Sequence, residues 1–370
     1  MVITNDVKMV ISKVPVATER IGYIDALRGF TMLLVVLHHV ASVFIVPETP
    51  SYHHYLQQIR MPMFFLVSGF VLYKAGVVWN LNHIGGFLKK KFVVQISSTL
   101  IFFIIYIHLK EVGFFCAIKE PAKLGYWFTY TLFFFYVFYA LIRYICGKHE
   151  EYVVIIVAAV FYVINWPPLY TSIPIPENVK TILGIENWFY FSFFLLGTLM
   201  KKHFDYIQRS LDKRMTMVIC ILLFFLLNIY HDILPSDGVG GVIIQFCKNI
   251  SGVLILFSLF RNKQAMFAKE MVLGRCLQYI GRRTLDIYLL HFFFLPNQLK
   301  HVTSIFKEYP MPVVEFTCSF IIACIVIAFC LLISNVIRLS PLLAHWLFGV
   351  KIPITTQPLR NETDCSDGVN

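Results

Sequence analysis

The residues best suited to chemistry lie together near the start of the chain, in the stretch RIGYIDALRGFTMLLVVLHH over residues 20–39. On a helix that turns about 100° per residue, the side chains of Arg28 and His39 lie within about 20° of each other. Asp25 lies about 60° to the other side of Arg28, and His38 points about 80° away from it. Asp25, Arg28 and His39 therefore share one narrow stripe, with His39 roughly 16 Å deeper than Arg28.

This stripe would suit proton transfer beside an anionic group. An imidazole exchanges protons near neutral pH, and an arginine can hold a phosphate or orient a carboxylate. Charged residues inside a membrane span are costly, and they are functional candidates by default. The structural alternative is that Asp25 and Arg28 only pair at the membrane surface while His39 bonds a neighbouring helix. The residues alone leave both interpretations open.

A second polar stripe lies far along the chain, where Thr284, Tyr288 and His291 have the i, i+4, i+7 spacing of one helical face. His291 is expected about 12 Å beyond Arg283, a depth comparable with that of His39. This spacing is equally compatible with residues that line a site and with residues that pack against a neighbouring helix.

Three single residues are further candidates for substrate binding. Ser68, beside Gly69, gives a small polar surface that suits close helix packing better than nucleophilic chemistry. Trp127 fits the aromatic belt of a membrane surface better than the wall of a cavity. Arg60 is expected at the outer mouth of the site, where it faces an acceptor or binds lipid headgroups. The sequence has no HExxH motif and no zinc-type Cys/His spacing, so no metal is expected.

Membrane-spanning helices must position these residues. The chain has 370 residues, of which 58% are hydrophobic and 14% are charged, and its mean hydropathy is +0.70. Soluble domains contain about 45–50% apolar and about 25% charged residues. Apolar blocks of about 18–20 residues have the length that crosses ~30 Å of hydrocarbon. We therefore expect an all-α integral membrane protein of about ten transmembrane helices, at 26–46, 60–78, 92–109, 125–145, 152–165, 187–200, 215–231, 239–260, 284–299 and 312–337.

The distribution of charge gives the expected topology. The net charge is +11, but Lys and Arg lie in short clusters between apolar blocks, without a nucleic-acid motif, so nucleic acid is not an expected partner. With the N-terminus inside, about 24 basic residues fall in inside segments and about seven fall outside, as the positive-inside rule requires. We expect a cytoplasmic segment at 1–20, one multipass domain at 21–350 and a polar, disordered cytoplasmic tail at 351–370.

Several segments resemble one family when they are read in order. RIGYIDALRGFTMLLVVLHH resembles the opening of the membrane acyltransferase 3 family, which has a D-x-L-R-G run and an arginine followed after ten residues by a histidine, as Arg28 and His39 are. MPMFFLVSGFVLYK (61–74), GYWFTYTLFFFYVFY (125–139), FSFFLLGTLMKK (191–202) and IGRRTLDIYLLHFFF (280–294) are similar to later segments of that family. The resemblance covers most of residues 20–335 and is nearest to fucose 4-O-acetyltransferase-like proteins.

This resemblance implies transfer of an acyl group from acyl-coenzyme A to a carbohydrate hydroxyl in the cell inner membrane, with acetyl-coenzyme A as a donor substrate and no permanently bound cofactor. His39 would be the general base, Arg28 would orient the donor or stabilise negative charge, and Asp25 would hold Arg28. The chain departs from the R-x-x-R or R-x-R pattern of many members. It has Lys89, Lys90 and Lys91 instead, which could bind the phosphates of coenzyme A or only anchor the chain at the membrane surface.

Two alternatives remain. A transporter that moves a lipid-linked sugar would also have many helices and intramembrane charges, but it should often show repeats and paired broken helices, which are not clear here. An inactive relative that acts as an assembly partner is the other alternative, and the presence of Asp25, Arg28 and His39 argues against it. The acceptor glycan, the acyl group, the side of the membrane on which the acceptor reacts and the oligomeric state are open.

Overall fold

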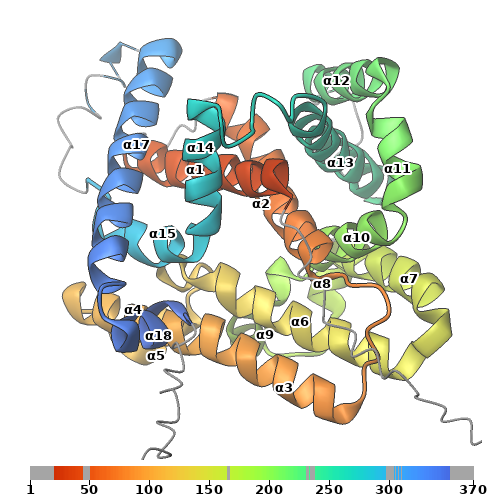
Figure 1. Cartoon of the computed structure of the whole chain (residues 1–370), viewed down its shortest axis with the longest axis horizontal. Coiled ribbons are helices and arrows are strands. Elements are labelled where there is room, and N and C mark those ends of the chain that lie inside the picture. Colours follow the sequence, from red (N-terminus) through yellow and green to blue (C-terminus); the bar gives the residue numbers. More distant parts are fainter. Residues whose placement is uncertain are drawn as a thin grey trace, which may run out of the picture.

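The computed structural model describes residues 21–44, 51–164, 167–230, 238–296 and 311–350, together with residues 233, 304, 306, 308 and 309. Within these residues every regular element is a helix (Figure 1). The expected N-terminal segment 1–20 and the expected tail 351–370 lie outside the described residues. An all-helical fold is what the apolar blocks predict, because a backbone in lipid has to satisfy its own hydrogen bonds.

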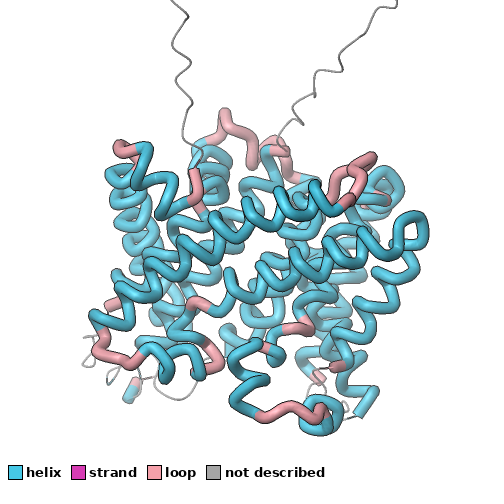
Figure 2. The backbone as a smooth tube through the Cα atoms, turned by 90° about the horizontal axis from the view of Figure 1, so that it is seen from below, coloured by secondary structure: helices cyan, strands magenta, loops and turns pink. Residues whose placement is uncertain are grey.

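The helices follow one another with short connections, and Figure 2 shows most of the loops near the two ends of the bundle. The α-helices are α1 (Gly22–Phe44), α2 (Ser51–Leu72), α3 (Leu81–Lys91), α4 (Ser98–Leu109), α5 (Phe114–Lys119), α6 (Trp127–Cys146), α7 (Glu150–Val163), α8 (Pro167–Ser172), α9 (Glu177–Leu183), α10 (Tyr190–Lys202), α11 (Phe204–Leu211), α12 (Arg214–Ile229), α13 (Gly238–Asn262), α14 (Val272–Arg282), α15 (Thr284–Leu290), α17 (Pro312–Ile337) and α18 (Pro341–Phe348).

Five helical segments of the described chain have the length and composition to cross a membrane: Gly22–Ser42, Leu81–Leu109, Trp127–Cys146, Gly238–Asn262 and Pro312–Ile337. The segments Arg214–Ile229 and Thr284–Phe293 are apolar but shorter. A multipass helical membrane protein is thus supported, and each predicted span overlaps a helix. The count of about ten spans and the side on which the termini lie stay predictions, because α7 and α10 are short, with 14 and 13 residues.

Two pairs of helices approach so closely that their backbones touch. A Cβ atom added at Gly29 of α1 or at Gly281 of α14 would lie 2.0 or 1.8 Å from a carbonyl oxygen of the facing helix. The same holds for Gly69 of α2 and Gly197 of α10, at 1.9 and 2.0 Å. Small residues permit such contacts between membrane helices. The predicted role of the surface around Gly69 in close helix packing is therefore confirmed.

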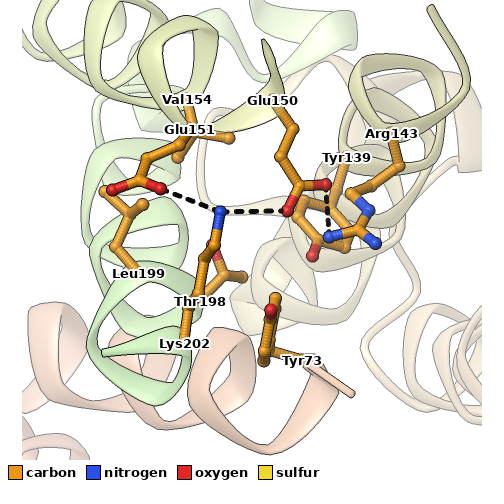
Figure 3. A pocket seen from close by; sticks show the side chains of 9 residues that line it. All are labelled: Tyr73, Tyr139, Arg143, Glu150, Glu151, Val154, Thr198, Leu199 and Lys202. Carbon is orange, nitrogen blue, oxygen red and sulfur yellow. Dashed lines mark hydrogen bonds and ion pairs between the residues drawn. The ribbon is translucent and has the colours of Figure 1, made fainter. Parts of the chain in front are cut away.

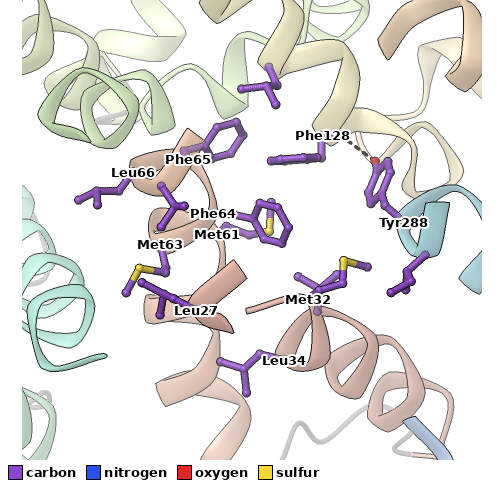
Figure 4. Packing of buried hydrophobic residues seen from close by; sticks show 14 of the residues in the cluster. Leu27, Met32, Leu34, Met61, Met63, Phe64, Phe65, Leu66, Phe128 and Tyr288 are labelled. Atoms are coloured by element: carbon purple, nitrogen blue, oxygen red, sulfur yellow. Dashed lines mark hydrogen bonds between the residues drawn. The ribbon is translucent and has the colours of Figure 1, made fainter. Parts of the chain in front are cut away.

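Aromatic side chains fill the space between α1, α2, α6 and α15 (Figure 4). Phe65 is fully buried, and its ring centroid lies 4.9 Å from that of Phe128 and 5.1 Å from those of Phe135 and Tyr190. Met32 of α1 is also fully buried. Rings at such distances add to the stability gained by burial. This core holds the four helices that carry the candidate site.

Candidate active site

The first polar stripe lies on α1 as predicted. Asp25 Oδ1 and Arg28 Nη1 are 4.0 Å apart, and Arg28 Nη2 donates a hydrogen bond of 3.1 Å to Thr284 Oγ1. His39 is on the same continuous helix, three turns further along. Arg28 is thus held between a carboxylate of its own helix and the first residue of α15.

The second stripe lies directly against the first. Thr284 contacts Arg28 at one end of α15, and at the other end the His291 ring centroid is 5.2 Å from that of His39. The helices α1 and α15 therefore run in the same direction, and their polar residues meet in order. Of the second stripe, Thr284 and His291 pack against α1, and only Tyr288 lines the cavity described below.

His291 is fully buried, and its ring is fixed by the backbone. Its Nδ1 lies 3.1 Å from the carbonyl oxygen of Ile287 and 2.8 Å from that of Tyr288. A carbonyl oxygen can only accept, so Nδ1 carries the proton and Nε2 keeps its lone pair. Nε2 is buried and has no hydrogen-bond partner among the described residues. His291 thus presents an unused acceptor inside the bundle, next to His39.

Two more histidines extend this contact towards the start of α2. The ring centroids of His39 and His38 are 5.3 Å apart, and those of His38 and His53 are 5.0 Å apart. Nδ1 of His38 and both ring nitrogens of His53 are buried without a partner among the described residues. No three His, Cys, Asp or Glu side chains in the described part of the chain converge as metal ligands. The angle of His38 on α1 predicts that it lies apart from the stripe, but its ring neighbour His53 is on another helix, α2.

A cavity opens beside His39. Its volume between the walls is about 450 Å³, the open mouth included. Most of the wall is apolar or aromatic, and His39 and Arg60 are its basic residues. Part of the wall is drawn in Figure 4. The cavity is lined by Met32, Val35, His39, Arg60, Met61, Phe64, Gly125, Trp127, Phe128 and Tyr288.

Four of the predicted site residues therefore meet in one place: His39, Arg60, Trp127 and Tyr288. The Trp127 ring stacks on that of Tyr190, with centroids 5.8 Å apart and planes 24° apart. The sequence favours the membrane belt for Trp127, whereas in the structure Trp127 lies in the cavity wall. The flat ring pair gives the cavity an apolar side.

Tyr288 connects α15 to the turn before α6. Its hydroxyl donates a hydrogen bond of 2.7 Å to the carbonyl oxygen of Gly125 and accepts one of 3.1 Å from the backbone N–H of Phe128. Gly125 has φ +97°, and a Cβ atom there would lie 1.9 Å from Cζ of Phe292. Only glycine fits both conditions. The turn that carries Trp127 is thus fixed against α15.

Arg60 enters the cavity from α2. Its Nε and Nη1 atoms are buried and have no hydrogen-bond partner among the described residues. It therefore differs from Arg28, whose guanidinium is held by Thr284.

The other predicted site residues do not line the cavity. The hydroxyl of Ser68 donates to the carbonyl oxygen of Phe64 in its own helix, at 2.8 Å. On α3, Lys89 and Lys90 are exposed, and Nζ of Lys91 lies 3.9 Å from the ring centroid of Tyr136. The lysines stay candidates for a part of a substrate outside the cavity, and Ser68 gains no support as a binding residue.

Comparison with known proteins gives one match. A family model described as an acyltransferase domain, that of acyltransferase 3, matches residues 21–335. The chain belongs to the acyltransferase 3 family. No curated protein and no solved structure matches it. The resemblance of the sequence segments is thereby confirmed, and so is the assignment to the acyltransferases.

In this acyltransferase, α15 is held in place by a carboxylate that sequence reasoning missed. Asp286 is almost fully buried and accepts hydrogen bonds from Arg338 Nε and Nη2, at 2.9 and 2.8 Å, and from the hydroxyl of Ser334. Arg283 Nη1 lies 3.3 Å from the same carboxylate. These bonds fix α15, which carries Tyr288, to α17. The available signal was a carboxylate inside an apolar segment, which is rare without a purpose.

The acyltransferase has a second polar cluster, at the ends of α6, α7 and α10 (Figure 3). Arg143 pairs with Glu150, and Lys202 Nζ lies 3.4 Å from Glu150 and 2.9 Å from Glu151. His203 Nε2 is 2.7 Å from Glu151. Hydrogen bonding from Lys202 lowers the pKa of Glu151. We call these five residues the paired cluster, because each positive or basic group in it has a carboxylate.

Proposed function

We propose that this acyltransferase moves an acetyl group from acetyl-coenzyme A to a hydroxyl of a cell-surface carbohydrate, in the inner (cytoplasmic) membrane. Membership of the family supports acyl transfer. The observation that carries the proposal is that His39 lines the cavity beside Arg60, Trp127 and Tyr288. An apolar, aromatic cavity with a few converging polar groups is the usual form of a small-molecule site.

In the proposed reaction, His39 takes the proton of the attacking hydroxyl as general base. The hydroxyl oxygen then forms a bond to the thioester carbonyl carbon, and the carbon–sulfur bond breaks. The thiolate of coenzyme A leaves with the electron pair of that bond and receives the proton from His39, so that the ester and free coenzyme A are the products. His291, in van der Waals range of His39, orients the base.

Arg28 is proposed to orient the donor at a point about 16 Å along α1 from His39, with Asp25 as a positioning residue. An arginine at this distance can bind a phosphate or another anionic part of a long donor. Lys89, Lys90 and Lys91 are proposed to attract the phosphates of coenzyme A at the membrane surface, as point charges.

The test is transfer of radiolabelled acetyl from acetyl-coenzyme A in membranes that contain the native surface glycan. Wild type is compared with His39→Ala, and His108→Ala at the exposed end of α4 is the matched control. We expect alkali-labile glycan ester with wild type and with the control, and a loss of about 10²–10⁴-fold with His39→Ala. Transfer at the wild-type rate by an equally abundant His39→Ala variant would remove His39 from the mechanism. No transfer by wild type would favour another donor, or transport of the sugar.

A further inference from the structure

Arg60 differs from every other arginine that is at least partly buried in the described chain. Five others are partly buried, and each has a carboxylate oxygen within 4.0 Å. These pairs are Arg28 with Asp25, Arg143 with Glu150, Arg261 with Asp212, and Arg283 and Arg338 with Asp286. Among the residues that the structure describes, no carboxylate forms an ion pair with Arg60, and its Nε and Nη1 atoms are buried without a hydrogen-bond partner.

Two buried guanidinium nitrogens without a partner are unfavourable, because they have lost hydrogen bonds to water and have formed none in return. Arginine does not escape this cost by losing its proton. The walls near Arg60 make the cost higher, since Met61, Phe64 and Trp127 of the same cavity are apolar. An arrangement that destabilises the empty protein persists when it serves a ligand. The missing negative charge is then the ligand's own.

The position of Arg60 limits which ligand this is. Arg60 lines the same cavity as His39, the proposed general base. The guanidinium presents a planar fork that matches a carboxylate or a phosphate. The stacked rings of Trp127 and Tyr190 offer a flat apolar surface beside it. The cavity thus combines a base, an anion site and a surface for the apolar face of a ring.

We propose that Arg60 binds an anionic group of the acceptor, so that the sugar unit acylated by this protein is acidic, with a carboxylate or a phosphate near the reacting hydroxyl. This inference rests on the proposed function, because it takes the cavity as the acceptor site. Arg60 acts here in binding of the acceptor before reaction. A lipid headgroup or coenzyme A also carries a negative charge that the Arg60 guanidinium could bind. The experiment separates these sources from the acceptor.

The experiment measures binding, so that it does not depend on acyl transfer. Full-length protein is placed in nanodiscs of phosphatidylcholine, and tryptophan fluorescence is titrated with methyl glucuronide, glucose 6-phosphate and the neutral methyl glucoside. We expect at least one anionic sugar to bind about 10- to 100-fold more tightly than the neutral one, as a charge-assisted hydrogen bond allows. The signal should disappear in Trp127→Phe, which identifies the cavity as the place of binding.

Variants at Arg60 separate charge from folding. Arg60→Met should abolish the preference for the anionic sugar, and Arg60→Lys should keep part of it, because it keeps the charge and loses the fork. Without ligand, Arg60→Met should melt at the same or a higher temperature than wild type, because it removes an unpaired buried charge. The anionic sugar should raise the melting temperature of wild type and leave that of Arg60→Met unchanged.

Four outcomes would overturn the proposal. The first is equal binding of neutral and anionic sugars or no binding of either anionic sugar, and the second is an unchanged preference in Arg60→Met. If addition of phosphatidylglycerol to the nanodisc displaces the sugar through Arg60, the lipid headgroup is the occupant. If free coenzyme A does so, the donor is the occupant. The proposed function can survive each of these results, since radiolabelled transfer to a neutral glycan would establish it while this inference fails.

Discussion

The paired cluster and the His39 cavity show two uses of polar residues in one helical bundle. In the paired cluster, Arg143 and Lys202 each contact a carboxylate, and their side chains are 11% and 26% exposed (Figure 3). Arg60 in the cavity wall and His291 beside His39 have buried nitrogen atoms without a partner among the described residues. Matched charges fix helices to one another. Buried polar groups without a partner beside a cavity destabilise the protein when no ligand is bound, and a ligand can supply the missing partner.

The largest effect on folding is expected from Glu150→Gln in the paired cluster. It leaves the guanidinium of Arg143, which is mostly buried, without its carboxylate, at a cost of about 2–4 kcal/mol. We expect a lower melting temperature of the purified protein, while acyl transfer per folded molecule stays within about twofold of wild type. The matched control is Glu270→Gln at an exposed position. A loss of activity as deep as that of His39→Ala would place this cluster in the catalytic machinery and break the comparison.

A smaller effect, at the cavity, is expected from Tyr288→Phe. The change keeps the ring and removes the hydroxyl that bonds Gly125 and the first turn of α6. An unpaired buried N–H group costs about 1–3 kcal/mol. Acyl transfer per folded molecule should fall by about tenfold, because the turn that places Trp127 is released.

The rate of acyl transfer and the melting temperature of Tyr288→Phe, measured on the same preparation, test this prediction. The same loss in a variant outside the cavity, such as Tyr279→Phe on α14, would mean that any lost tyrosine hydroxyl has this effect. Tyr279 is suitable because its hydroxyl also donates a hydrogen bond, of 2.8 Å, to Asn335.

The smallest effect is expected from the double variant Lys89→Gln, Lys90→Gln, since both side chains are exposed. Stability should stay within about 0.5 kcal/mol of wild type. The KM for acetyl-coenzyme A should rise about two- to fivefold at low salt, and the difference should vanish near 1 M salt, where charges are screened within about 3 Å. The kcat should not change. If the control Lys213→Gln, Lys263→Gln behaves in the same way, these lysines act only through the general charge of that surface.

The features that depend on one segment of chain could be predicted from the sequence. A helix is defined by local hydrogen bonds, so the apolar blocks gave the helices, and the spacing from Arg28 to His39 gave the stripe. The contact of α1 with α15 could not be predicted, because angles on one helix say nothing about which helix lies opposite. For the same reason His38 was set aside, although it lies beside His53. That no described carboxylate pairs with Arg60 likewise depends on every neighbouring helix.

The glycine contacts between helices have a mechanical consequence. At Gly29 and Gly281, and at Gly69 and Gly197, carbonyl groups fill the space of the missing side chains, so neither helix of a pair can slide along the other without a collision. Each of the pairs α1/α14 and α2/α10 is thus expected to move as one rigid unit. The cavity is lined by residues of both α1 and α2, so it lies between these two helix pairs. Any widening of the cavity is therefore expected to come from movement between the two pairs and not from movement within either pair.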